Sequence, residues 1–159
     1  MRIDIQTGDV YLEEFGKILW NGVSEEQLKG TKFYRENLEK EWQTYERVLW
    51  YIFKPISVLN QELSISYIYV DHILHHITFR LPSQLGDPTG WDDWSEEKEI
   101  EIMVRYGDFF GQLLNIPKPK KSKYWRSFEF DWGGLYSRYD LKSQSTMNGL
   151  YYNPIKSES

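Results

Sequence analysis

The sequence predicts an α+β fold in which an antiparallel β-sheet, built from hairpins and a meander, packs against two main helices. Runs of β-branched and aromatic residues are grouped together, and helical patterns occur only near residues 24–41 and 93–116. Strands and helices therefore do not alternate as they do in a parallel βαβ sheet. With 159 residues and 40% hydrophobic content, the chain can bury one core. We expect a single domain over residues 1–155 and a frayed tail over residues 156–159.

A β-hairpin is the first predicted element. Residues 3–5 and 10–12 alternate between apolar and polar side chains on either side of a Thr-Gly pair at residues 7–8, which is typical of a two-residue turn. Pairing across this turn places Ile5 opposite Val10, so the aliphatic side chains of both strands are expected to share one face.

The first helix is predicted to begin after Ser24. The hydroxyl of Ser24 can cap the helix, and Gln27 three residues later completes a capping box. The helical pattern continues to about Glu41 and brings Trp42 close to the apolar face. Gly30 can divide this segment into a short turn and a second helix.

Three strands are predicted over residues 48–53, 65–70 and 73–81, and the last two form a hairpin around residues 71–72. Regular pairing across this turn separates their side chains onto two faces. The face that we expect in the core carries Ile68, Val70, Ile73, His75, Ile77 and Phe79. The face that we expect to be half-exposed carries Ile65, Tyr67, Tyr69, Leu74, His76 and Arg80.

A second main helix is predicted after a loop rich in Gly, Pro and Asp at residues 84–90. Asp93 or Ser95 can cap its first turn, and Pro117 ends it. Its apolar side chains recur at helical spacing, at Ile100, Val104, Gly107, Phe110 and Leu114. Three more strands, over residues 124–130, 135–139 and 146–152, complete the expected fold.

Composition disfavours several classes of function. The chain contains no cysteine, which removes thiol nucleophiles, disulfides and thiolate metal sites. Its net charge of −5 argues against nucleic acid or an anionic membrane as the main partner. The N-terminus lacks the apolar run of a signal peptide, and the stretch from Val48 to Phe53 is too short to span a bilayer. We therefore expect a cytoplasmic protein.

The sequence offers no recognisable catalytic or cofactor motif. It has neither the G-x-S-x-G of a serine hydrolase nor a glycine-rich phosphate loop. All three histidines, His72, His75 and His76, lie within five residues of one another, but His75 and His76 would point to opposite faces of a regular strand. We expect no metal site, no cofactor and no enzymatic activity, and we interpret the histidines as exposed or hydrogen-bonded sheet residues.

Charge is distributed unevenly along the second half of the chain. Residues 87–101 contain seven acidic residues and one lysine, whereas residues 117–126, which include the Lys118–Lys123 loop, contain five basic residues and no acid. The simplest interpretation is a solvated, capped helix followed by a solubilising loop. The functional interpretation is a docking surface for a basic partner. The residues that would form this surface are Trp91, Asp92, Asp93, Trp94, Glu96 and Glu97.

The aromatic content of 17% keeps a second class of function open. Three tryptophans are expected in the core: Trp20, Trp42 and Trp50. Three others, at element ends or in loops, are expected at the surface: Trp91, Trp94 and Trp132. Because exposed Trp and Tyr rings can stack on sugars, a carbohydrate-binding or other small-ligand-binding module is the main alternative. A small hydrolase that uses paired carboxylates is the third.

Three segments carry a resemblance to a known group of proteins. They are Gly22-Val-Ser-Glu-Glu, Trp91-Asp-Asp-Trp-Ser-Glu-Glu-Lys-Glu and Phe130-Asp-Trp-Gly-Gly-Leu-Tyr-Ser-Arg-Tyr-Asp. With the predicted meander between the first two, they resemble small bacterial proteins that are similar to immunity proteins of polymorphic-toxin and contact-dependent inhibition loci. The resemblance implies a cytoplasmic, non-enzymatic protein that binds one cognate toxin domain and blocks its active site or its access to substrate. Such a complex typically buries about 800 Å² on each partner.

Overall fold

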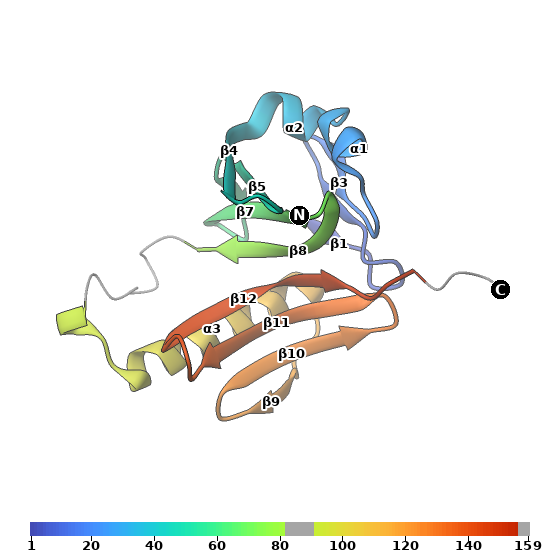
Figure 1. Ribbon diagram of the computed structural model, residues 1–159. Helices are drawn as coiled ribbons and strands as arrows, with labels where there is room; N and C mark the ends of the chain where they lie inside the picture. The colour runs from blue at the N-terminus through green and yellow to red at the C-terminus, as the bar shows by residue number, and fades with distance from the viewer. Residues whose placement is uncertain (82–90, 156–159) are drawn as a thin grey trace.

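The computed structural model describes residues 1–81 and 91–155, and it confirms an α+β fold dominated by antiparallel strands (Figure 1). The strands are β1 (Arg2–Ile3), β2 (Val10–Leu12), β3 (Gly16–Leu19), β4 (Leu38–Tyr45), β5 (Val48–Phe53), β6 (Ile56–Val58), β7 (Gln61–Val70), β8 (Ile73–Arg80), β9 (Lys120–Ser122), β10 (Trp125–Phe130), β11 (Gly133–Asp140) and β12 (Ser145–Tyr152). The helices are α1 (Glu25–Lys29), α2 (Lys32–Asn37) and α3 (Glu96–Leu114), and a 3₁₀ turn, η2 (Trp91–Asp93), precedes α3.

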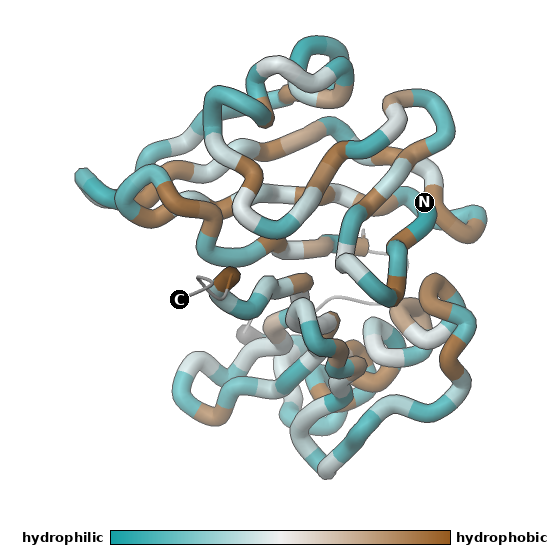
Figure 2. The backbone as a smooth tube through the Cα atoms, turned by 90° about the vertical axis from the view of Figure 1, so that its right-hand side faces the viewer, coloured by the Kyte–Doolittle hydropathy of each residue, from teal (hydrophilic) through white to brown (hydrophobic). Residues whose placement is uncertain are grey.

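The strands form one small and one large sheet. The small sheet has the order β1-β2-β3, and the large sheet has the order β4-β5-β7-β8-β12-β11-β10-β9, with β6 paired to β7. At the centre of the large sheet, β8 and β12 share only two register pairs, Ile77 with Leu150 and Thr78 with Gly149. We call β4, β5, β7 and β8 the first half-sheet and β9 to β12 the second half-sheet. Figure 2, turned by 90°, shows hydrophobic segments along the strands of both.

The N-terminal hairpin has a different register from the predicted one. Ile3 pairs with Val10, and Ile5 is exposed in the connecting loop. The loop is longer than a two-residue turn because the carboxylate of Asp4 accepts a hydrogen bond from the N–H of Gln6 at 2.8 Å. A third strand, β3, which the sequence did not predict, pairs with β2.

The first helical segment begins as predicted and ends earlier. Ser24 and Gln27 form the expected capping box, and the helix breaks at Gly30. The second piece, α2, ends at Asn37, and the chain then enters β4, which pairs along its length with β5. The prediction of a helix to Glu41 is therefore wrong, because cross-strand pairing outweighs helical spacing here. One long helix and two short ones take the place of two main helices.

Trp42 and Trp50 do not lie in the core. Trp42 is 47% exposed on β4 and sits opposite the half-buried Trp50. Trp20 is half-buried and packs against the core, closer to the expectation. Both tryptophans lie on the face of the sheet that points away from the core cluster. Their exposure follows from the alternation of side chains along a strand, which places every second residue on this face.

The hairpin of β7 and β8 contains a β-bulge that overturns the predicted faces. Ile68 pairs with His76, but Tyr69 pairs with Leu74, so His75 is an extra residue on β8. The core face is therefore the tyrosine face, where Tyr67 and Tyr69 are almost completely buried. Across the bulge, Ile77 and Phe79 join this tyrosine face, whereas Ile68 and His76 point the other way.

Hydrogen bonds explain how the core accommodates these tyrosines. The hydroxyl of Tyr67 donates to the carbonyl of Ile18 at 2.7 Å, and the hydroxyl of Tyr69 donates to the carbonyl of Val23 at 2.9 Å. A buried hydroxyl costs little when it is paired in this way. The two bonds also attach the small sheet and the start of α1 to β7.

The long helix α3 covers one face of the second half-sheet (Figure 1). Ser95, one of the two predicted caps, accepts a hydrogen bond from the N–H of Lys98, and Asn115 closes the helix in the left-handed conformation. The buried side of α3 includes three of the five predicted positions, Gly107, Phe110 and Leu114, whereas Ile100 and Val104 are half-buried. The other buried side chains of α3 lie outside the predicted set: Glu99, Ile102, Met103, Tyr106 and Phe109. The strands predicted at 124–130, 135–139 and 146–152 correspond to β10, β11 and β12.

Trp132 is buried rather than at the surface. Its ring is 7% exposed and stacks on Phe130, and its indole N–H donates to the carbonyl of Ile5 at 2.9 Å. Gly8 lies against it at φ +78°, where an added Cβ would stand 2.5 Å from the indole. Trp132 therefore joins the turn before β11 to the N-terminal hairpin, a contact between distant segments that the local sequence does not reveal.

Two further points complete the description. The expected loop at 84–90 and the expected tail at 156–159 lie outside the described residues. Within residues 1–81 and 91–155, none of the helices combines the length and apolar character that crossing a bilayer requires.

We predict that Glu99 fastens α3 to β12. Its buried carboxylate accepts hydrogen bonds from the N–H and the hydroxyl of Thr146, both at 2.9 Å. Glu99→Ala leaves that N–H without its acceptor and should reduce the free energy of unfolding by about 1–3 kcal/mol, measured by urea denaturation. The exposed substitution Asp108→Ala on the same helix is the control and should change it by less than about 0.5 kcal/mol. Equal effects of the two substitutions would contradict this role.

Candidate functional site

The large sheet has one covered and one uncovered face. Helix α3 packs on the second half-sheet, and on the first half-sheet Phe33 of α2 stacks on Phe53 of β5 with ring centroids 4.3 Å apart. No described element packs on the opposite side, which we call the open face. Large apolar side chains are nevertheless exposed there: Trp42, Tyr45, Trp125 and Met147. Clustered exposed apolar side chains are typical of an interaction surface.

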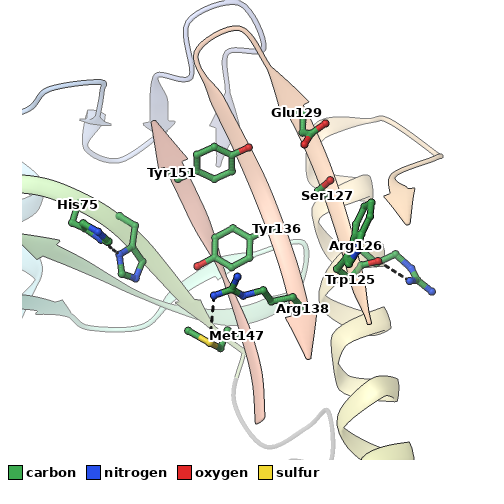
Figure 3. Close-up of a pocket in the computed structure, with 10 residues that line it drawn as sticks. His75, Trp125, Arg126, Ser127, Glu129, Tyr136, Arg138, Met147 and Tyr151 are labelled. Atoms are coloured by element: carbon green, nitrogen blue, oxygen red, sulfur yellow. Dashed lines mark hydrogen bonds between the residues drawn. The ribbon is translucent and has the colours of Figure 1, made fainter. Parts of the chain in front are cut away.

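A groove crosses the open face where the two half-sheets meet (Figure 3). It has a volume of about 630 Å³ and is open to solvent along its length. We call it the junction groove. Side chains from β8, β10, β11 and β12 line it, among them His76, Trp125, Tyr136, Arg138, Met147 and Tyr151. Burial raises the pKa of Tyr136 and of Tyr151, so both hydroxyls stay protonated donors at neutral pH.

Two histidines meet at one side of the junction groove. The Nδ1 atoms of His75 and His76 lie 2.6 Å apart, with ring centroids separated by 4.9 Å. The argument that these side chains point to opposite faces is wrong, because the bulge in β8 brings both rings to the open face. His72 lies elsewhere and contacts the carboxylate of Glu25 at 2.7 Å. Among the described residues, no three His, Asp or Glu side chains converge to hold a metal ion.

The environment of His76 disfavours its charged form. Burial, and after it the charge of the neighbouring His75, lowers the pKa of His76 to about 4. At neutral pH the ring of His76 is therefore uncharged.

The predicted acidic docking residues occupy one end of the molecule, at η2 and the first turn of α3 (Figure 1). We call Asp92, Asp93, Trp94, Glu96 and Glu97 the acidic tip. Asp92, Asp93 and Glu97 are exposed, whereas Trp94 and Glu96 are half-buried. Trp91 belongs to η2, and its side chain lies outside the description.

Trp94 attaches the acidic tip to the rest of the fold. Its indole N–H donates to the carbonyl of Gln144, in the turn between β11 and β12, at 2.9 Å. The ammonium of Lys98 donates to the carbonyl of Asp93 at 2.9 Å. These two hydrogen bonds hold the backbone of the tip in place, so its carboxylates have a defined position on the surface.

The lysine-rich segment is partly a strand rather than a loop. Residues Lys120–Ser122 form β9 at the edge of the second half-sheet and pair with β10. Lys120 forms an ion pair with Glu129 of β10. Lysine on an exposed edge strand discourages pairing with other chains, which fits the interpretation of this segment as solubilising.

Several residues of the junction groove escaped sequence reasoning. The sequence predicts strands at Trp125, Tyr136 and Arg138 and does not mark these residues as candidates for a site. A signal was present in β11, where Tyr136 and Arg138 alternate with the buried Leu135, Ser137 and Tyr139, as expected for a sheet with one covered face. The sequence alone did not show that β8 would bring histidines to the same place.

Comparison with known proteins gives one informative result. No family model and no curated protein matches the sequence. The fold resembles a chain of the solved structure described as "Rhs1-CT in complex with cognate immunity protein RhsI1", with a TM-score of 0.54 and 15% sequence identity. The match covers 96% of this chain and 87% of that chain. This is a likeness of fold, and it agrees with the resemblance to polymorphic-toxin immunity proteins.

We predict that His76 makes the fold sensitive to mild acid. Because its pKa is about 4 in the folded protein and about 6.5 in the unfolded chain, only the unfolded chain takes up this proton between those values. Stability should therefore be complete above pH 6.5 and should fall as the pH decreases toward 4. Between pH 7 and pH 5 the loss should be about 1 kcal/mol, half the unscreened linkage value of roughly 2 kcal/mol because the ring is partly exposed.

The variant His76→Asn should flatten this pH dependence, measured by denaturant unfolding at pH 7, 6 and 5. His72→Asn is the matched control, since His72 is solvent-exposed and contacts Glu25 instead of the pair. Measurements are kept at pH 5 and above because carboxylates titrate mainly below pH 5, so the observed change in stability reports on the histidine. If the stability of His76→Asn depends on pH as steeply as that of the wild type, the pH dependence does not come from His76.

Proposed function

We propose that this chain is an immunity protein that neutralises a cognate toxin domain by tight one-to-one binding, without enzymatic activity of its own. The observation that carries the proposal is the likeness of fold, over 96% of the chain, to a chain of a toxin–immunity complex. The resemblance of three sequence segments to immunity proteins of polymorphic-toxin and contact-dependent inhibition loci supports it independently. For a protective role of this kind we propose a cytoplasmic location.

The surfaces of the molecule fit a protein partner. The open face carries exposed apolar side chains over a broad area, and the acidic tip adds exposed carboxylates at one end. A stable one-to-one complex needs about 800 Å² on each partner. A shallow surface of aromatic side chains bordered by charge is the composition found at such interfaces.

The proposed contact surface is the acidic tip, with Trp91 preceding it. Its carboxylates would attract a basic surface on the toxin and accelerate the encounter, because opposite charges steer association. Toxins that act on nucleic acid carry basic substrate-binding surfaces, which such a tip would cover. The half-buried ring of Trp94 would supply apolar contact next to the charges.

One observation favours the alternative of carbohydrate binding. Trp125 is 41% exposed and borders a groove that also contains Tyr136 and Tyr151, and flat aromatic rings beside polar groups can stack on sugars. Titration of neutral saccharides with detection by tryptophan fluorescence distinguishes the two functions. Quenching in the wild type that disappears in Trp125→Ala would favour the sugar.

The proposal is tested by rescue of growth. The candidate toxin is the C-terminal domain of any large secreted protein encoded immediately upstream, and it is expressed from an inducible promoter together with this chain. Induction of the toxin domain should stop growth, and co-expression of this chain should restore it. Growth arrest that persists although both proteins are expressed and folded would contradict the proposal.

We predict that charge reversal at the tip slows association. The double substitution Asp92→Lys and Asp93→Lys should reduce the association rate with the toxin domain about tenfold or more at low salt and should weaken its salt dependence, measured by stopped-flow fluorescence. The matched control is Glu13→Lys with Glu14→Lys, which makes the same charge change at an exposed turn outside the tip. If both double variants behave alike, the tip is not the contact surface.

A further inference from the structure

We infer that the junction groove is a second contact region for the toxin domain and that it receives an acidic segment of that partner. The inference deepens the proposed function and rests on it. It concerns a different part of the surface from the acidic tip, and it assigns the opposite charge to the partner there.

The first observation is an arginine without a carboxylate partner. Arg138 is exposed, its guanidinium lies 5.8 Å from the ring centroid of Tyr136, and it reaches the sulfur of Met147 at 3.9 Å (Figure 3). No ion pair joins Arg138 to an acid among residues 1–81 and 91–155. The pKa of Asp140 is lowered mainly by hydrogen bonds from Ser143 and Lys142. The charge of Arg138 makes a smaller contribution to this lowering, at longer range. A guanidinium held on an aromatic ring is ready to bind a carboxylate in two-point fashion.

The second observation is a set of hydroxyl groups that are free to donate hydrogen bonds. The hydroxyls of Tyr136, Tyr151 and Ser127 line the groove, and within the described part of the chain none of them donates to another group. The one acid of the lining, Glu129, is already paired with Lys120. The groove therefore presents hydroxyl groups that are free to donate, next to the positive charge of Arg138. An anionic group satisfies such a set better than a neutral or cationic one.

The third observation is the apolar surface that continues from the groove. A second hollow on the open face shares His75, His76 and Met147 with the junction groove and extends to Trp42 and Trp50. Among the described residues that line this second hollow there is no Asp, Glu, Lys or Arg. Together the two hollows reach from β4 to β10, which is an area suited to a protein surface rather than to a small molecule.

The fourth observation is continuity with the acidic tip. Trp94 binds the turn between β11 and β12, and the two strands that leave this turn carry Arg138 and Met147, which are register partners. One partner domain can therefore cover the tip and the groove at once. Negative charge at one end and positive charge at the other would fix the orientation of the partner, since a reversed complex would bring like charges together.

The closing experiment measures the affinity of the toxin domain for two groove variants. Arg138→Ala removes the cation and Met147→Glu adds a competing carboxylate, and each should weaken binding at least tenfold by calorimetry. Arg35→Ala, which removes an exposed arginine from α2, is the matched control and should bind like the wild type. Thermal unfolding of every variant shows that the fold is retained. If the wild type binds and both groove variants bind equally well, this inference is overturned and the proposed function stands.

If the wild type does not bind the toxin domain, the proposed function is contradicted, and a second arm then tests the groove by itself as a site for an acidic segment. The probe is the synthetic peptide Asp-Glu-Trp-Glu-Asp, titrated into labelled protein and followed by NMR, with Lys-Lys-Trp-Lys-Lys as the control peptide. Shifts at the Trp125 indole and the Arg138 side chain with the acidic peptide only, lost in Arg138→Ala, support the groove as an acidic-segment site. Absence of those shifts, or equal shifts with both peptides, overturns it.

Discussion

The short ladder between β8 and β12 is the constraint on which the rest of the structure depends. Two register pairs, Ile77 with Leu150 and Thr78 with Gly149, hold the two half-sheets together. Gly149 is required there, since a Cβ at this position would collide with the carbonyl oxygen of Ile77. Ile77 and Leu150 are completely buried on the covered side of this ladder. Because the ladder is so short, the strands diverge on either side of it, and the junction groove forms on the open face.

The same arrangement explains how one face became available for binding. Short helices and the small sheet cover the first half-sheet, and α3 covers the second, with Glu99 and Thr146 linking α3 to β12. The core is thus complete without the open face. Aromatic side chains on that face do not contribute to the core. The bulge in β8 places His75 and His76 beside them. Bulges of this kind commonly redirect side chains at functional sites.

Local signals in the sequence predicted local features well. The capping box at Ser24, the break at Gly30, the cap at Ser95 and the last three strands depend on neighbouring residues, and all are present. Features set by distant contacts were missed. The register of the N-terminal hairpin, the burial of Trp132 and the strand that replaces the end of the first helix each depend on pairing or packing with a remote segment.

The candidate site divides in the same way. The acidic tip can be recognised in the sequence because its acidic residues are consecutive or nearly so. The junction groove cannot be recognised there, because its residues come from four different strands. The proposed function joins these surfaces to a single protein partner. The measurement that tests it most directly is calorimetry of this chain with the C-terminal domain of any large secreted protein encoded immediately upstream. The account predicts one-to-one binding with a nanomolar dissociation constant. Absence of binding between two well-folded proteins would contradict it and would favour the sugar-binding alternative.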